Sequence, residues 1–314
     1  IDTLCSLAQA AASNSYVCPE MSKGNEIEIK DGRHPVVELM LEGAPFVPND
    51  TGLDCKMNRC AIITGPNMAG KSTYMRQVAL IVLLAQMGSF VPASSASIGI
   101  VDSIFTRIGA SDDLSAGQST FMVEMSEVAS ILTHATRNSL IVFDEIGRGT
   151  STFDGMSISR AVLEYTADIK KLGAKTLFAT HYHELTELEE QVEGVKNYNI
   201  AVKKRGDEIT FLRRIVRGGA DGSYGIEVAK LAGIPSSVVN RAKVILKELE
   251  ETDLNKSNKR SAVDSVDSQE EQVSFYSNAE REITEKLRSI DVNTLTPIEA
   301  MGILYELARE AGKI

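Results

Sequence analysis

Three short segments of this chain are almost continuously apolar, and longer amphipathic segments separate them. The apolar segments cover residues 60–64, 139–143 and 176–179, and residues 208–212 form a further predicted strand. Strands without polar alternation are typical of a parallel sheet that is buried on both faces. The alternation of strands and helices between Cys60 and Thr180 therefore predicts an α/β fold with a mostly parallel sheet flanked by helices.

The segments on either side of this pattern are less regular. Residues 1–20 predict the end of a helix that stops near Pro19, and residues 26–30 alternate like a strand. After the sheet, residues 226–232 and 236–250 predict two helices that are separated by a Gly-Ile-Pro turn.

The composition changes after residue 250. Residues 251–272 are rich in Ser, Asp, Glu and Lys and almost free of large apolar residues, which predicts a flexible linker. Two amphipathic helices are expected beyond it, at 274–290 and from Thr296, where Pro297 takes the first helical position. Two such short helices bury little surface alone, so we expect them to pair with a copy in another chain. Packing against their own domain is the alternative.

Charge and cysteine content narrow the function. The net charge of −10 over 314 residues argues against a large nucleic-acid-binding surface, because phosphate contacts require clustered Lys and Arg. The four cysteines lack zinc-ligand spacing, so free thiols in a cytoplasmic protein are expected. No apolar run reaches the about 18 residues of a membrane span. The chain begins with Ile1 and has no signal-peptide pattern, so it is expected to be a piece of a longer protein.

The strongest chemical signal is a glycine-rich loop at residues 65–73, between a predicted strand and a predicted helix. It fits the phosphate-binding pattern G-x-x-x-x-G-K-[ST] at every fixed position. Backbone N–H groups at the start of a helix bind phosphates, and glycines let the backbone approach closely. Lys71 is expected to reach the β- and γ-phosphates, and the Ser72 hydroxyl to bind Mg²⁺. The predicted nucleotide-binding residues of the loop are Gly65, Pro66, Asn67, Met68, Ala69, Gly70, Lys71, Ser72 and Thr73.

Two carboxylates, Asp144 and Glu145, follow the apolar strand at 140–143. Ligands of parallel α/β sheets bind at the carboxyl ends of the strands. Asp144 is therefore expected to hold Mg²⁺. Glu145 is expected to orient and deprotonate an attacking water. A carboxylate pair that merely ends a strand is the alternative, and the upstream phosphate loop argues against it.

Two further segments are candidates for contacts with phosphate. Ser119 ends a loop of small residues just before a helix predicted to begin near Phe121, and a helix start is a ready anion site. Because one nucleotide needs one phosphate loop, Ser119 is expected to serve a nucleotide on a partner subunit; a capped surface helix is the alternative. His181 follows the strand at 176–179 and could reach the γ-phosphate.

Together these motifs resemble the ATPase domain of the bacterial mismatch-recognition family MutS. The motifs are GRHP at 32–35, GPNMAGKSTYMRQ at 65–77, FTRIGA at 105–110, STFMVEM at 119–125, DEIGRGTST at 144–152 and FATHY at 178–182. The resemblance implies a P-loop NTPase fold of the ABC-ATPase type, with helical segments at the C-terminus.

The resemblance also implies roles for single residues. An ABC-type site is shared between two subunits, so Ser119 would contact the partner's nucleotide in trans. Asn67 and His181 would contact the γ-phosphate, with His181 among the catalytic groups. Phe46 resembles the residue that stacks on adenine, and Asn199 falls where relatives often carry a histidine near the base.

The domain organisation implied by the resemblance has five parts. They are the end of the lever or core helices at 1–30, the ATPase domain at 31–222, a helix-turn-helix dimer contact at 223–250, the linker at 251–272 and an oligomerisation segment at 273–314. The implied assembly is a homodimer, or a tetramer through 273–314.

The implied function is ATP binding and hydrolysis, with ATP/ADP and Mg²⁺ as ligands, that drives the mismatched-DNA recognition and sliding-clamp cycle of DNA mismatch repair. Mismatched double-stranded DNA would be bound by domains absent from this chain. A MutL-type partner and a location in the bacterial cytoplasm, at the nucleoid, are also implied.

Three other interpretations of the sequence are possible. A transporter ATPase would need a helical subdomain for which the segment between Lys71 and Ser115 is too short. A DNA-binding helix-turn-helix at 226–250 would need more basic charge than the near balance of Lys, Arg and Glu found there. The remaining alternative is another ABC-class module that acts as a nucleotide-gated dimerisation scaffold without hydrolysis.

Overall fold

The computed structural model describes residues 1–43, 45–66, 69–109, 119–205, 208–219, 224–260, 301–303 and 305. The chain divides into two units, Ile1–Val244 and Ile245–Ile314. In the second unit the described residues are the C-terminal part of one helix and a helical segment at 301–303. The predicted helices at 274–290 and from Thr296 otherwise lie outside the described residues.

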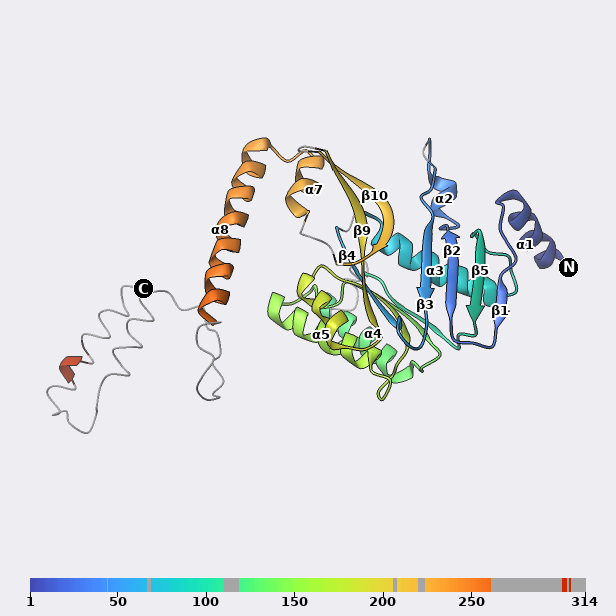
Figure 1. The fold of residues 1–314 in the computed structure, drawn as a ribbon, viewed down its shortest axis with the longest axis horizontal. Helices are drawn as coiled ribbons and strands as arrows, with labels where there is room; N and C mark the ends of the chain where they lie inside the picture. Colours follow the sequence, from blue (N-terminus) through green and yellow to red (C-terminus); the bar gives the residue numbers. More distant parts are fainter. Residues whose placement is uncertain are drawn as a thin grey trace. The chain divides into compact units, whose positions relative to one another are not determined.

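The larger sheet of the first unit is mostly parallel (Figure 1). Its strand order is β10 (Glu208–Arg217), β9 (Val195–Arg205), β4 (Cys60–Thr64), β8 (Lys175–Ala179), β7 (Leu140–Asp144) and β6 (Ile104–Arg107). Only the β9–β10 pair is antiparallel among these strands. This confirms the predicted α/β fold with a mostly parallel sheet.

Helices cover both faces of this sheet, which explains why its strands lack polar alternation. On one face, Ile63 and Val142 pack with residues of α3 (Lys71–Gln86) such as Met75 and Val78. On the other face the neighbouring strand residues pack with α4 (Thr120–His134) and α5 (Thr152–Ala167). That second cluster includes Ile62, Ile141, Phe143 and Phe178 from the strands, with Val128, Ile131, Val162 and Leu163 from the helices.

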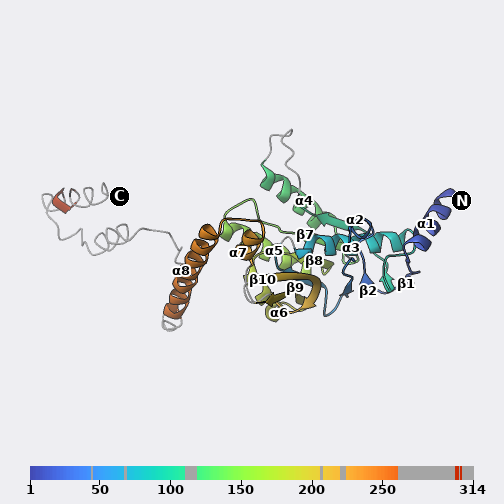
Figure 2. The same ribbon diagram turned by 90° about the horizontal axis from the view of Figure 1, so that it is seen from above.

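A second sheet has the order β1 (Glu20–Ser22), β5 (Ser95–Gly99), β2 (Ile27–Gly32) and β3 (Asn49–Leu53). It is antiparallel except for the β1–β5 pair. Ile27 and Ile29 of β2 belong to the same apolar cluster as Met75 of α3, so α3 packs against both sheets (Figure 2). Helix α3 therefore shares one apolar cluster with both sheets.

Three element boundaries differ from the sequence-based expectation. Helix α1 (Asp2–Ser13) ends well before Pro19, because Ser15 takes a left-handed conformation and Val17 pairs with Val91. Helix α8 (Ser236–Arg260) extends into the predicted linker, where Glu, Lys and Leu favour a helix. Strand β10 continues to Arg217 through a bulge.

The remaining elements are short. They are α2 (Val37–Met40), a 3₁₀ helix, η3 (His183–Glu187), α6 (Leu188–Gln191) and α7 (Gly225–Leu231). None of the described helices has the length and apolar character of a membrane span.

Candidate functional site

The phosphate loop connects β4 to α3, as its sequence predicts. Gly65 and Gly70 have φ of 130° and 107°, a region that residues with a β-carbon rarely adopt. Helix α3 begins at Lys71, immediately after Gly70, so its first N–H groups face the loop. Ala69 is buried and donates its N–H to the Pro66 carbonyl. Asn67 and Met68 lie outside the described residues.

Lys71 is the charged residue of this loop, and it is buried. Its side chain is 1% exposed, and its Nζ donates to the Gly65 carbonyl and lies 3.4 Å from Glu145 Oε1. Burial lowers the pKa of Lys71, and the charge of Glu145 opposes that shift. The Lys71 ammonium group is thus held next to the loop by Glu145 and the Gly65 carbonyl.

The order of the strands explains how Lys71 and Glu145 meet. β8 lies between β4 and β7, and all three are parallel, so their carboxyl ends share one edge of the sheet. The phosphate loop follows β4, Asp144 ends β7, and His181 follows β8. Three segments distant in sequence therefore converge at this edge.

Asp144 and Ser72 form the second part of the site. Burial raises the pKa of the Asp144 carboxyl, and a hydrogen bond with the Ser72 side chain partly opposes that rise. A hydroxyl and a carboxylate are the oxygen ligands that Mg²⁺ prefers. A bound dication would also offset the cost of burying this charge. The donor set therefore fits Mg²⁺.

Glu145 has a strained backbone. Its φ is 58°, although it is not glycine, and its N–H donates to the Ala179 carbonyl at 3.0 Å. Such a conformation costs about 1–3 kcal/mol and persists only where the surroundings enforce it. The side chain is 10% exposed, and its Oε2 lies 2.8 Å from Arg148 Nη1. Arg148 was not predicted, although it lies in the same sequence motif.

His181 lies at the outer side of this group. Its ring packs on Tyr182, with 4.0 Å between the ring centroids. Desolvation lowers the pKa of His181, while the charge of Glu145 acts in the opposite direction. The neutral imidazole is therefore the favoured form at neutral pH.

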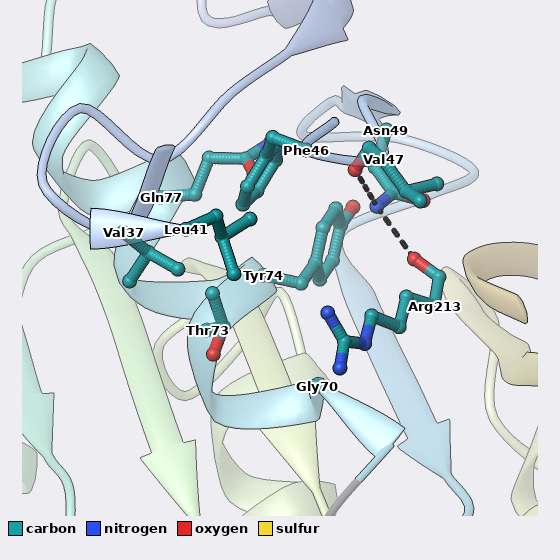
Figure 3. Close-up of a pocket in the computed structure, with 10 residues that line it drawn as sticks. All are labelled: Val37, Leu41, Phe46, Val47, Asn49, Gly70, Thr73, Tyr74, Gln77 and Arg213. Carbon is teal, nitrogen blue, oxygen red and sulfur yellow. Dashed lines mark hydrogen bonds between the residues drawn. The ribbon is translucent and has the colours of Figure 1, made fainter. Parts of the chain in front are cut away.

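A cavity of about 280 Å³ lies beside the first turns of α3 (Figure 3). Phe46 and Tyr74 line it with Leu41, and Gly70 places the cavity next to the phosphate loop. The other lining residues are Val37, Val47, Asn49, Thr73, Gln77 and Arg213. A mostly apolar cavity with an aromatic wall suits a flat heterocycle such as a nucleobase.

Arg213 enters this cavity because of a bulge in β10. The strand register shifts between Phe211 and Ile215, and Arg213 has a left-handed φ of 55°. Asn49 fixes the bulge: its Nδ2 donates to the Arg213 carbonyl at 3.0 Å, and its Oδ1 accepts from Ile215 N at 2.7 Å. Figure 3 shows the Arg213 side chain extending toward Gly70.

Asn199, at the position where relatives often carry a histidine near the base, is not among the residues that line the cavity. Its Nδ2 donates to the Gly218 and Gly219 carbonyls, at 2.9 Å each. Arg213 is among the lining residues. No local sequence signal marks it, because the bulge depends on the distant Asn49.

Ser119 is exposed and caps α4, with its Oγ accepting from Met122 N at 3.2 Å. This is the local role that the alternative interpretation assigned to it. The rest of the small-residue loop, at 114–118, lies outside the described residues. The trans contact therefore stays a prediction.

His34 precedes α2, whose Val37 lines the cavity, and its titration allows the stability of this region to be tested by changing the pH. Its Nδ1 accepts from Val36 N and Val37 N, at 3.3 and 3.2 Å, and so satisfies the start of α2. Burial and the charge of Arg76 lower the pKa of His34 below its usual 6.5. A depressed histidine pKa gives stability that is present above pH 6.5 and declines as the pH falls toward the folded-state value.

From pH 7.5 to pH 5.5, we therefore expect the free energy of unfolding of the wild type to decrease by about 1 kcal/mol more than that of His34→Asn. One helix-capping hydrogen bond contributes about this much. Asparagine can accept through Oδ1 without titrating. Urea unfolding at several pH values measures the difference, and His183→Asn is the control. An equal pH dependence in wild type and His34→Asn would contradict this role.

The fold and this site define a class, the P-loop nucleotide-binding domains. Residues 61–250 match the family model of MutS domain V, and residues 277–310 match that of the DNA mismatch repair protein MutS C-terminal region. The chain belongs to the MutS family.

Relatives named DNA mismatch repair protein MutS align along nearly the whole chain. Those of Caldicellulosiruptor bescii and Ruminiclostridium cellulolyticum are each 62% identical over 99% of this chain, and that of Acetivibrio thermocellus is 61% identical over 99%. In each case the chain spans 36% of the relative's length.

Proposed function

We propose that this chain binds ATP with Mg²⁺ and hydrolyses it to ADP and phosphate. The observation that carries the proposal is the convergence of Lys71, Ser72, Asp144 and Glu145 at one sheet edge, with Lys71 Nζ 3.4 Å from Glu145 Oε1. Phosphate, Mg²⁺ and attacking water must meet in this way during phosphoryl transfer.

Each residue has a distinct task in the proposed reaction. The N–H groups that open α3 and the Lys71 ammonium bind the β- and γ-phosphates. Ser72 and Asp144 would hold Mg²⁺, which would neutralise charge on the phosphates. Glu145 orients the attacking water and accepts its proton, while Arg148 holds the carboxylate in place. His181, favoured as the neutral form, can hydrogen-bond the γ-phosphate.

The base would lie in the cavity between Phe46 and Arg213. An aromatic ring and a guanidinium group can both stack on a heterocycle. The cavity adjoins Gly70, so one nucleotide can fill it while its phosphates occupy the loop.

Family membership supports a place for this ATPase in DNA mismatch repair. We propose that nucleotide turnover drives the mismatched-DNA recognition and sliding-clamp cycle of the longer protein, whose DNA-binding parts lie outside this chain. Ser119 would contact the nucleotide of a partner subunit in a homodimer. The buried, strained Glu145 favours hydrolysis over a scaffold that only binds nucleotide.

The direct test is ATP binding and phosphate release by the purified chain, with Mg²⁺ and with EDTA. Binding and release that both require Mg²⁺ would support the proposal. Nucleotide binding without phosphate release would favour the scaffold.

The base cavity gives a separate prediction. Phe46→Ala should weaken ATP and AMP binding about tenfold, the usual worth of one stacked base, and leave inorganic triphosphate binding unchanged. Isothermal titration with the three ligands measures this, and Phe90→Ala, which removes an exposed ring elsewhere, is the control. If triphosphate binding fell as well, Phe46 would be supporting the fold and not the base.

A further inference from the structure

The short loop after Glu145 is held from several sides by other elements. Gly147 N donates to Glu124 Oε1 at 2.6 Å, and the Gly147 carbonyl accepts from the Tyr182 hydroxyl at 3.1 Å. The Ile146 carbonyl accepts from Ser159 Oγ of α5 at 2.7 Å. The backbone two residues beyond Glu145 is thus fixed by side chains from α4 and from the segment that carries His181.

Glu124 is unusual among these groups because it is a buried carboxylate. It is 5% exposed, and its second oxygen lies 3.6 Å from Arg107 Nη2 at the end of β6. A charge is rarely buried without an ionic or hydrogen-bonded partner. Here Arg107 supplies the countercharge, and Gly147 supplies the hydrogen bond.

A second contact joins α4 to the same loop. A β-carbon added at Gly149 would lie 2.9 Å from Phe121 Cβ, so the loop and the first turn of α4 meet at backbone distance. Gly147 also has a left-handed φ of 84° and packs against Gly155. The first turns of α4, which begin at the Ser119 cap, and the loop that carries Glu145 therefore have little freedom to move separately.

We propose that Glu124 is a positioning residue for ATP hydrolysis: through Gly147 it couples the Ser119 end of α4 to the placement of Glu145. The proposal rests on the function proposed above. A shift of α4 would move Gly147, and with it Arg148, which contacts the Glu145 carboxylate at 2.8 Å. Hydrolysis at one site would thereby respond to whatever contacts the start of α4.

The chain offers a matched control on the same helix. Glu127 pairs with the same Arg107, at 3.0 Å, and is 46% exposed. Its only described ion pair is this one, and Glu124, not Glu127, accepts from Gly147. Glu127→Ala therefore removes an ion pair of Arg107 but keeps the hydrogen bond from Gly147 N to Glu124.

The test compares single-turnover hydrolysis and ATP Kd in the full chain. Glu124→Ala should lower the hydrolysis rate roughly 10- to 100-fold, the usual cost of misplacing a catalytic group, and leave the Kd for ATP unchanged. Glu124→Gln keeps an acceptor for Gly147 N and should restore most of the rate. Tyr182→Phe should cause a smaller loss, and Glu127→Ala none.

Amide hydrogen exchange provides a readout that does not need turnover. The Gly147 amide should exchange faster in Glu124→Ala and at the wild-type rate in Glu127→Ala. Glu124→Gln also serves if the alanine variant fails to fold. Its rate and exchange should both stay near those of wild type.

Two failures can be told apart. If the wild-type chain releases no phosphate from ATP, the proposed function is wrong and this inference falls with it. If Glu145→Ala is inactive but Glu124→Ala turns over like wild type, only the positioning role is wrong. Equal losses in Glu124→Ala and Glu127→Ala would assign the effect to Arg107 and overturn the link through Gly147.

Discussion

Replacing Glu145 with alanine is expected to leave ATP binding intact and to slow hydrolysis by roughly 100- to 10,000-fold, the range that a positioned general base contributes. Alanine keeps the β-carbon, so the left-handed backbone at this position is no more hindered than with glutamate. The loss should therefore report on the carboxylate alone. Because Glu145 lies 3.4 Å from Lys71, its removal takes away one competitor for the ammonium and should not weaken phosphate binding.

Single-turnover phosphate release and ATP titration measure the two effects separately. Glu164→Ala removes an exposed carboxylate that pairs with Arg160 and serves as the control, with no expected change. Turnover retained by Glu145→Ala would exclude this residue as the base. A matching loss of ATP affinity would show that Glu145 supports the loop.

Three adjacent strands of the larger sheet, β4, β8 and β7, could be predicted because each is a continuous apolar run, whereas β6 and β9 have no such run. Continuous apolar runs such as 140–143 are typical of strands that helices cover on both faces, and here α3 and α5 do so. The hydrophobic pattern of the second sheet is weaker. β3 (Asn49–Leu53) turns Asn49 and Thr51 inward, so its buried positions are partly polar and include no continuous apolar run.

The residues of the candidate site likewise divide into those that the sequence predicts and those that it does not. Lys71, Ser72, Asp144 and Glu145 belong to contiguous motifs, and parallel strand order brings their tips together. Arg213 could not be predicted, because its place depends on a bulge held by Asn49 from far along the chain. The role of Glu124 was equally hidden: the sequence placed it in the first turns of a helix, and only the fold shows that it accepts from Gly147.

Replacing Lys71 with methionine should weaken ATP and triphosphate binding about 100-fold, since a charge-assisted hydrogen bond to phosphate is worth up to about 3 kcal/mol. Methionine resembles the lysine stem in length and apolar character, which limits the cavity left at a side chain that is 1% exposed. AMP binding should be unchanged, because AMP lacks the β- and γ-phosphates that Lys71 would contact.

This pattern is the reverse of that expected for Phe46→Ala, which should weaken AMP and ATP alike but spare triphosphate. Titration of both variants with the same three ligands thus separates the phosphate half of the site from the base half. Lys170→Ala, an exposed lysine in the turn before β8, is the charge control. If Lys71→Met lost AMP and ATP affinity equally, its buried contacts to Gly65 and Glu145 would be maintaining the fold, and its proposed role at the phosphates would be wrong.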